Sequence, residues 1–310
     1  MSNKSPLLNI IFQSLNKVTR NLVRDFGEIE NLQVSPNSIE RFVSKTQKQI
    51  ITVLTDELSK ARPEWQFKSN PRSESTLNKH YWIIDILSGK LNFSHGVPYF
   101  AISISVELDN EIISTVVLDP LRDEIYFAEK GKGSYLNDRR IRVSKRSSLS
   151  SCIFSIYNET MLDNNPPRKN YFDSVNSLAS KYSSVTREFG CSALNFAWLA
   201  SGKVDCLFAN GLNKNKVACG ELLIKEAGGY LTNMKYISAY KSSEDLLIAA
   251  NPVIHKELLK KINKSSWRTQ IGYVSQDTLI FDDTIANNIS MWSGDIVDNE
   301  KLLELSLIHI

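Results

Sequence analysis

The carboxylate of Asp85 is the first side chain in the sequence whose position suggests chemistry. Trp82, Ile83 and Ile84 precede it as a short apolar run, which is typical of a buried strand. A loop that contains Gly89 follows, so we expect the strand to end at Asp85. Functional side chains are concentrated where a rigid scaffold passes into a loop. Asp85 is therefore our first candidate for a site residue.

Other residue types that often carry chemistry are scattered along the sequence. The four cysteines show neither CxxC spacing nor the density of a disulfide scaffold, so we expect small buried thiols. The glycines at 131 and 133 lack the G-x-x-x-x-G-K-[ST] frame of a phosphate-binding loop and suit a hairpin turn. The histidines, which lack metal-ligand spacing, are His80, His95, His255 and His309.

The stretch 82–96, WIIDILSGKLNFSHG, resembles the signature of the inositol monophosphatase family, W-[VI]-[IV]-D-P-[IL]-D-G-T-x-N-F-x-H-G. In that family the two Asp residues of the signature bind Mg²⁺, and its Thr helps to position the attacking water. Ser88 stands here in place of the second Asp, and Lys90 in place of the Thr. The resemblance implies a phosphatase framework whose chemistry is altered. The matching residues are Trp82, Asp85, Gly89, Asn92, Phe93, His95 and Gly96.

Further positions that carry acids in the family are also substituted. Gln47 replaces an Asp available to a further metal ion, and Lys216 replaces the metal-binding Asp of W-D-x-A-A-G. Asn70 and Pro71 replace two Glu residues, one a metal ligand and one that orients water. Using Glu74 as the metal ligand instead would require a shift in the alignment of this segment with the family motif. By resemblance, Asp85 is the only retained metal ligand.

Several backbone features of the family remain usable. The turn Gly190, Cys191 and Ser192 opens a helix whose N-terminal N–H groups face the substrate in the family, and backbone donors survive side-chain changes.

Lys90 and Lys216 would lie where Mg²⁺ lies in the enzymes. The cleft that contains them and Gly89 is therefore expected to hold a phosphate-bearing ligand without metal. The alternative is that the lysines only fill a relaxed site. Ala209, in place of a substrate-binding Glu, weakens the case for inositol.

The substitutions invert the local charge. It changes from about −5 in the family to about +1 here, counting Asp85, Lys90 and Lys216, and each lysine repels a divalent cation by roughly 0.5 to 3 kcal/mol. Loss of Mg²⁺ implies loss of hydrolysis. Three hypotheses follow: a non-catalytic family member that binds a phosphate-bearing ligand or a protein partner, an active Mg²⁺-dependent phosphatase with rearranged ligands such as Glu74 or Asp119, and an exporter-associated protein.

The elements that must position these residues follow from periodicity. Apolar residues at three- and four-residue spacing predict helices over about 6–26, capped by Ser5, and from Ser38 to about 61. Alternating patterns over 101–144 predict an antiparallel sheet, and strands alternating with helices from about 150 predict an α/β half. The resemblance covers about residues 6–263 and implies the layered α-β-α-β-α sandwich of the family.

We expect an N-terminal half over 1–149, a C-terminal half over 150–264 and a tail over 265–310. The tail stretch 266–293 resembles the Q-loop region of ATP-binding cassette exporters, with Gln276 as the glutamine, but the chain lacks a Walker A loop. We interpret the tail as a fused fragment or an assembly junction.

Composition sets the remaining expectations. The 310 residues are 42% hydrophobic and 23% charged, as in an ordinary globular protein, and no apolar run reaches the 18 residues of a membrane span. We therefore expect a cytoplasmic protein and, by resemblance, a homodimer. The net charge of +3 combines −5 over 266–310 with +8 elsewhere. Without a basic cluster interleaved with aromatic residues, nucleic acid is not an expected partner.

Overall fold

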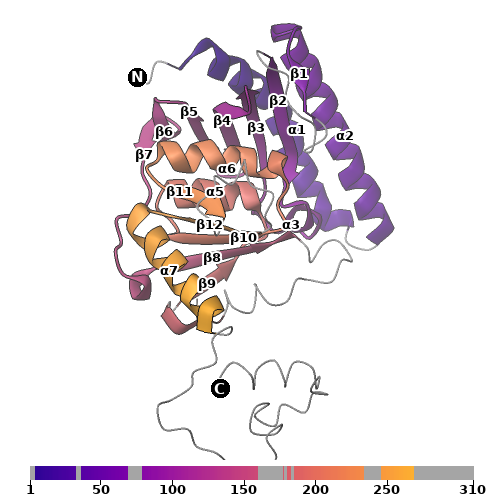
Figure 1. Ribbon diagram of the computed structural model, residues 1–310. Coiled ribbons are helices and arrows are strands. Elements are labelled where there is room, and N and C mark those ends of the chain that lie inside the picture. The colour runs from indigo at the N-terminus through magenta and orange to yellow at the C-terminus, as the bar shows by residue number, and fades with distance from the viewer. Residues whose placement is uncertain are drawn as a thin grey trace, which may run out of the picture. The chain divides into compact units, whose positions relative to one another are not determined.

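Two amphipathic helices open the chain in the computed structural model (Figure 1), α1 (Pro6–Leu32) and α2 (Pro36–Ala61). The Ser5 hydroxyl accepts a hydrogen bond from the Leu8 N–H at 3.2 Å, so Ser5 caps α1 as predicted. Helix α2 begins two residues before the predicted start and ends ahead of Pro63. The structure describes residues 4–32, 36–68, 79–159, 177, 180–182, 185–233 and 246–268.

Seven strands form the first sheet in sequence order: β1 (Gln66–Phe67), β2 (His80–Ser88), β3 (Ala101–Leu108), β4 (Glu111–Asp119), β5 (Glu124–Glu129), β6 (Gly133–Leu136) and β7 (Arg139–Ile141). All neighbouring strands are antiparallel except β1 and β2, which are parallel. The short helix α3 (Lys90–Ser94) lies between β2 and β3. The predicted antiparallel sheet is confirmed.

The second half builds a mixed sheet with the strand order β11-β12-β10-β8-β9. Strand β8 lies parallel to both β9 and β10, whereas β12 is antiparallel to its two neighbours. Its elements are β8 (Ile153–Asn158), β9 (Val185–Glu188), α5 (Ser192–Ala200), β10 (Cys206–Asn210), α6 (Lys214–Glu226), β11 (Tyr230–Asn233), β12 (Leu246–Ala250) and α7 (Pro252–Arg268).

Three hydrophobic clusters join these elements into layers. The first lies between helices α1 and α2 and the first sheet, and the second packs α5 and α6 between the two sheets. The third lies between the second sheet and α7, and it includes Cys152 and Cys206. The predicted five-layer sandwich is confirmed (Figure 1). All four cysteines are buried and free, as predicted.

The hairpin predicted at residues 131–133 joins β5 to β6. Gly131 and Gly133 have φ angles of 77° and 88°, which favour glycine. Their N–H groups donate to the two carboxylate oxygens of Glu226, each at 2.8 Å. Glu226 ends α6, so this contact fixes that helix against the hairpin of the first sheet.

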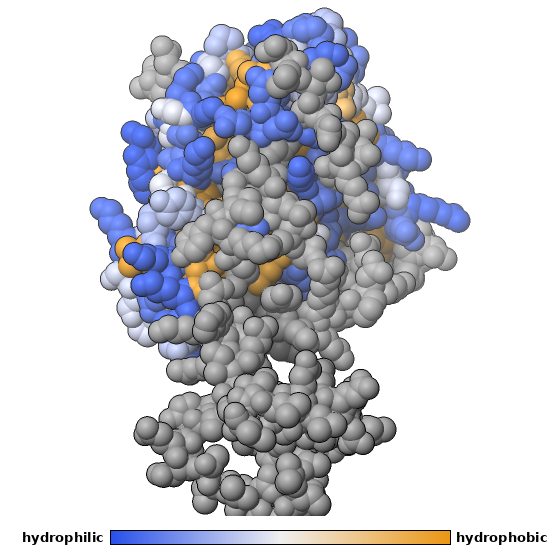
Figure 2. Space-filling view, viewed as in Figure 1, coloured by the Kyte–Doolittle hydropathy of each residue, from blue (hydrophilic) through white to orange (hydrophobic). Residues whose placement is uncertain are grey.

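By contacts the chain divides into two compact units, Met1–Asn263 and Lys264–Ile310. Beyond the last turn of α7, the second unit lies outside the described residues, and so do Gln276 and most of the stretch that resembles a Q-loop. The domain boundaries at 150 and 265 stay predictions. None of the helices in the described part has the length and apolar character that crossing a membrane requires. Where described residues show in Figure 2, hydrophobic side chains appear in small groups between hydrophilic ones.

Candidate functional site

Asp85 lies within strand β2 and not at its end. The strand continues to Ser88, with a register shift between Asp85 and Ser88 where the pairing to β3 is interrupted. The predicted strand end is therefore three residues too early. Ile83 packs in the cluster under α5 and α6, and side chains two apart share a face of a strand. Asp85, which is half-buried, thus faces the layer that holds α6.

Lys216 reaches the same region from the first turn of α6. Asn213 caps this helix, and its side-chain oxygen accepts the Lys216 N–H at 3.0 Å. The Lys216 ammonium forms an ion pair with the carboxylate of Glu159. Glu159 directly follows β8, whose Asn158 pairs with Asn210 at the end of β10. Two parallel strands therefore end side by side, so that Glu159 lies close to the start of α6.

The charges of Lys216 and Glu159 both act on the pKa of Asp85. Burial raises the pKa of Asp85 above its usual range, the Lys216 ammonium lowers it, and the Glu159 carboxylate raises it further. Smaller lowering effects on this pKa come from the Leu87 N–H and the Ser88 hydroxyl. Glu159 was not among the residues predicted from the sequence. The available signal was the same one that identified Asp85, namely an acid placed directly after an apolar strand.

Glu159 is held by a second donor. The Tyr157 hydroxyl donates to its other carboxylate oxygen at 2.5 Å. Tyr157 is buried, and this burial raises the pKa of its hydroxyl, with further contributions from the charge and hydrogen bond of Glu159. The side chains of Lys216 and Glu159 are 30% and 16% exposed, so solvent reaches the pair.

Ser88 is bonded to the start of α5. Its hydroxyl accepts the Ala193 N–H at 3.2 Å and lies 3.2 Å from the Ser192 hydroxyl. The Cys191 thiol donates to the Ser88 carbonyl at 3.3 Å, and burial raises the pKa of this thiol to about 12. One of the first N–H groups of α5 is therefore occupied by Ser88, while Gly190, with φ of 74°, forms the turn before the helix.

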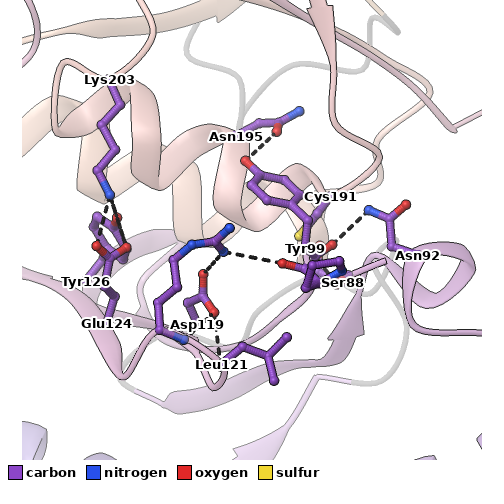
Figure 3. A network of polar contacts seen from close by, with 12 residues as sticks. Ser88, Asn92, Tyr99, Asp119, Leu121, Glu124, Tyr126, Cys191, Asn195 and Lys203 are labelled. Carbon is purple, nitrogen blue, oxygen red and sulfur yellow. Dashed lines mark hydrogen bonds and ion pairs between the residues drawn. The ribbon is translucent and has the colours of Figure 1, made fainter. Parts of the chain in front are cut away.

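Retained motif residues around α3 support the backbone. Gly89 has φ of 85°, and a Cβ there would lie 2.9 Å from the Tyr99 carbonyl, so only glycine fits. The Asn92 amide donates to the carbonyls of Tyr99 at 2.8 Å (Figure 3) and Phe189 at 2.7 Å. Asn92 thereby connects the α3 loop to the segment before α5. Lys90, the first residue of α3, is exposed and forms no ion pair with another described residue.

The remaining predicted positions lie on other elements or outside the described residues. Gln47 is half-buried on α2, and Asn70, Pro71 and Glu74 lie outside the described residues. Asp119, considered as an alternative metal ligand, forms an ion pair with Arg122 at 2.6 Å and accepts the N–H of Leu121 at 3.2 Å. Figure 3 shows the Asp119–Leu121 contact.

A groove of the described chain also lies elsewhere. It has a volume of about 890 Å³, runs along the exposed face of α2 and is lined in part by Arg41, Lys45 and Lys48. None of the predicted site residues is among those that line it.

The residues that the structure brings together do not fit Mg²⁺. A Mg²⁺ site needs oxygen ligands in near-octahedral geometry. Within the described ranges, no three His, Cys, Asp or Glu side chains are placed to hold a metal ion. The Lys216 ammonium pairs with Glu159 and acts electrostatically on Asp85, and Ser88 contributes no charge.

Comparison with known proteins places the chain in a family. Residues 3–269 match the inositol monophosphatase family. The chain is 36% identical over 268 residues to an inositol-1-monophosphatase from Mesorhizobium japonicum, an alignment that covers 84% of this chain and 97% of the relative. It is 30% identical over 265 residues to the putative Nus factor SuhB of Neisseria meningitidis, covering 84% and 98%. The crystal structure of the extragenic suppressor protein suhB from Bartonella henselae has a TM-score of 0.69 at 31% identity, covering 84% and 100%. The chain therefore belongs to the inositol monophosphatase family.

Proposed function

We propose that this chain has lost metal-dependent hydrolysis and binds a phosphate-bearing ligand without metal. One observation carries the proposal: the cation that pairs with Glu159 and acts electrostatically on Asp85 is the ammonium of Lys216, a residue of the chain itself. Metal-dependent phosphatases use bound Mg²⁺ to clamp phosphate oxygens and to acidify the attacking water. An ammonium supplies neither an open coordination position nor an acidified water.

The local charge supports this proposal. Adding Glu159 to the residues counted from the sequence brings the sum of Asp85, Glu159, Lys90 and Lys216 to about zero, well above the strongly negative site of the family. Such a site gathers divalent cations weakly. Lys90 is exposed and Lys216 is partly exposed, so both ammonium groups are accessible to an anion. Lysine binds phosphate as a compact point charge.

Isothermal titration calorimetry with inorganic phosphate in excess chelator tests the proposal. We expect the wild-type chain to bind, and the double variant Lys90→Ala, Lys216→Ala to lose binding. Lys203→Ala is the matched control, because Lys203 also forms an ion pair with a glutamate that accepts a tyrosine hydroxyl, and its side chain is 36% exposed. Absence of binding to the wild type, or binding that survives in the double variant, would rule the proposal out.

The alternative function is an active Mg²⁺-dependent phosphatase of inositol or sugar monophosphates. Two observations favour it: the 36% identity to an inositol-1-monophosphatase, and the second carboxylate that Glu159 brings close to Asp85. Release of phosphate from a panel of monoesters, dependent on Mg²⁺ and abolished by Asp85→Asn, would establish this activity. The homodimer stays a prediction, which sedimentation of the full chain tests.

A further inference from the structure

Two carboxylates of this chain are held in the same way. Glu159 accepts hydrogen bonds from Lys216 and from Tyr157, two residues before it. Glu124 on β5 accepts from Lys203 at 3.0 Å and from Tyr126, two residues after it, at 2.6 Å (Figure 3). The two triads differ in their surroundings. Both charged members of the first triad act electrostatically on Asp85, whereas β3 and β4 separate the second triad from the strand that carries Asp85.

The carboxylate of Glu159 fills a small site for an anion. One of its oxygens is bonded to the Lys216 ammonium and the other to the Tyr157 hydroxyl. Two donors, one of them charged, thus converge on a planar group that carries a single negative charge. Phosphate oxygens accept the same charge-assisted hydrogen bonds.

We propose that Glu159 is a built-in competitor for the anion site formed by Lys216 and Tyr157. This inference rests on the proposed function and adds a residue that sets affinity. A phosphate group must displace the Glu159 carboxylate before it gains both donors. Asp85 strengthens the competition, because its carboxylate also interacts electrostatically with Lys216. While Glu159 is still bound to Lys216, an approaching phosphate is repelled by both carboxylates.

Exposure is consistent with such an exchange. The Lys216 and Glu159 side chains are 30% and 16% exposed, so an anion reaches the ammonium from solvent. Tyr157 is only 6% exposed and keeps its place in the hydrophobic cluster between the sheets. The Tyr157 hydroxyl therefore stays available as a fixed donor when the carboxylate leaves.

The test is phosphate affinity in excess chelator, measured by calorimetry on the full chain. In Glu159→Gln the competing charge is removed with little change in shape, and we expect phosphate to bind about tenfold more tightly than to the wild type or better, since a charge-assisted hydrogen bond no longer has to be broken. Glu159→Ala must act in the same direction. Adding Lys216→Met or Tyr157→Phe to Glu159→Gln should weaken binding again. The matched control is Glu124→Gln, which breaks the other triad and should leave the affinity unchanged.

Each outcome decides a different point. If the wild type binds phosphate and neither Glu159 variant binds more tightly, the competition is refuted while the proposed function stands. If only the Glu159 variants bind, and Lys216→Met abolishes that binding, the competition is supported and phosphate binding by the wild type is refuted. If Glu124→Gln tightens binding equally, a general charge effect explains the data and the inference fails. If no variant binds, both the inference and the proposed ligand class are refuted.

Discussion

Replacing Lys216 by alanine tests whether an ammonium has taken the place of a metal ion. In the wild-type chain this ammonium offsets the two carboxylates of Asp85 and Glu159. Its removal leaves two neighbouring acids without their internal cation. Breaking a fully buried ion pair costs about 3–5 kcal/mol, and the partial exposure of this pair reduces the expected loss to about 1–2 kcal/mol.

The same variant should gain a weak response to Mg²⁺. Two carboxylates with water completing the shell resemble a low-affinity cation site, for which a dissociation constant of about 1 mM is reasonable. At about 10 mM Mg²⁺ the gain is RT ln(1 + 10), about 1.4 kcal/mol. For a unit of this size, that corresponds to an increase in Tm of about 3–6 °C. The wild-type chain should shift by less than about 1 °C, because Lys216 repels the ion.

Differential scanning fluorimetry with and without MgCl₂, at matched ionic strength, measures these shifts. Lys203→Ala is the control, because it removes an ammonium from a single carboxylate, Glu124, and should gain no Mg²⁺ response. The double variant Lys216→Ala, Glu159→Gln should lose the gain. A Mg²⁺ shift of several degrees in the wild type would refute the reasoning, since the site would then hold metal despite the lysine, as the active-phosphatase alternative requires.

Three further predictions concern stability. Burial lowers the pKa of His255 to about 4. The contribution of neutral His255 to the free energy of unfolding is therefore complete above pH 6.5, the ordinary histidine pKa being about 6.5, and it falls as the pH drops below that value. Urea unfolding should show a loss of about 2 kcal/mol between pH 7 and pH 5, and His255→Gln should reduce this loss. Glu226→Ala removes the acceptor of the Gly131 and Gly133 N–H groups and should cost about 1–3 kcal/mol in the same assay, whereas an unchanged midpoint would mean that water replaces the carboxylate. Burial raises the pKa of Asp85 in the folded state, so the contribution of its protonated form to stability is present at low pH and is lost as the pH rises. The Tm of Asp85→Asn should therefore increase relative to the Tm of the wild type from pH 4 to pH 8. A constant Tm difference would contradict the assigned effect of burial.

The helices and the hairpin of this protein were predictable because local sequence patterns determine them. Helical spacing of apolar residues located α1 and α2, and the glycines at 131 and 133 located a hairpin, since a positive φ favours that residue at the turn. Family motifs identified Asp85 as a candidate and Ser88 and Lys216 as substituted positions. Local patterns misplaced the end of β2, because pairing with β3 extends the strand past Asp85 through an irregular register.

The partners of the charged residues were decided only in three dimensions. The sequence shows that Lys216 replaces an acid, but not that Glu159, 57 residues earlier, neutralises it. That pairing arises because β8 and β10 run parallel and end together, which brings the residue after one strand to the helix that follows the other. In the same way, Ser88 binds the start of α5 only because the two sequence-distant segments meet. Periodicity encodes which face of an element is buried, whereas the electrostatics of a site depends on which elements become neighbours, and the order of residues along the chain does not contain that information locally.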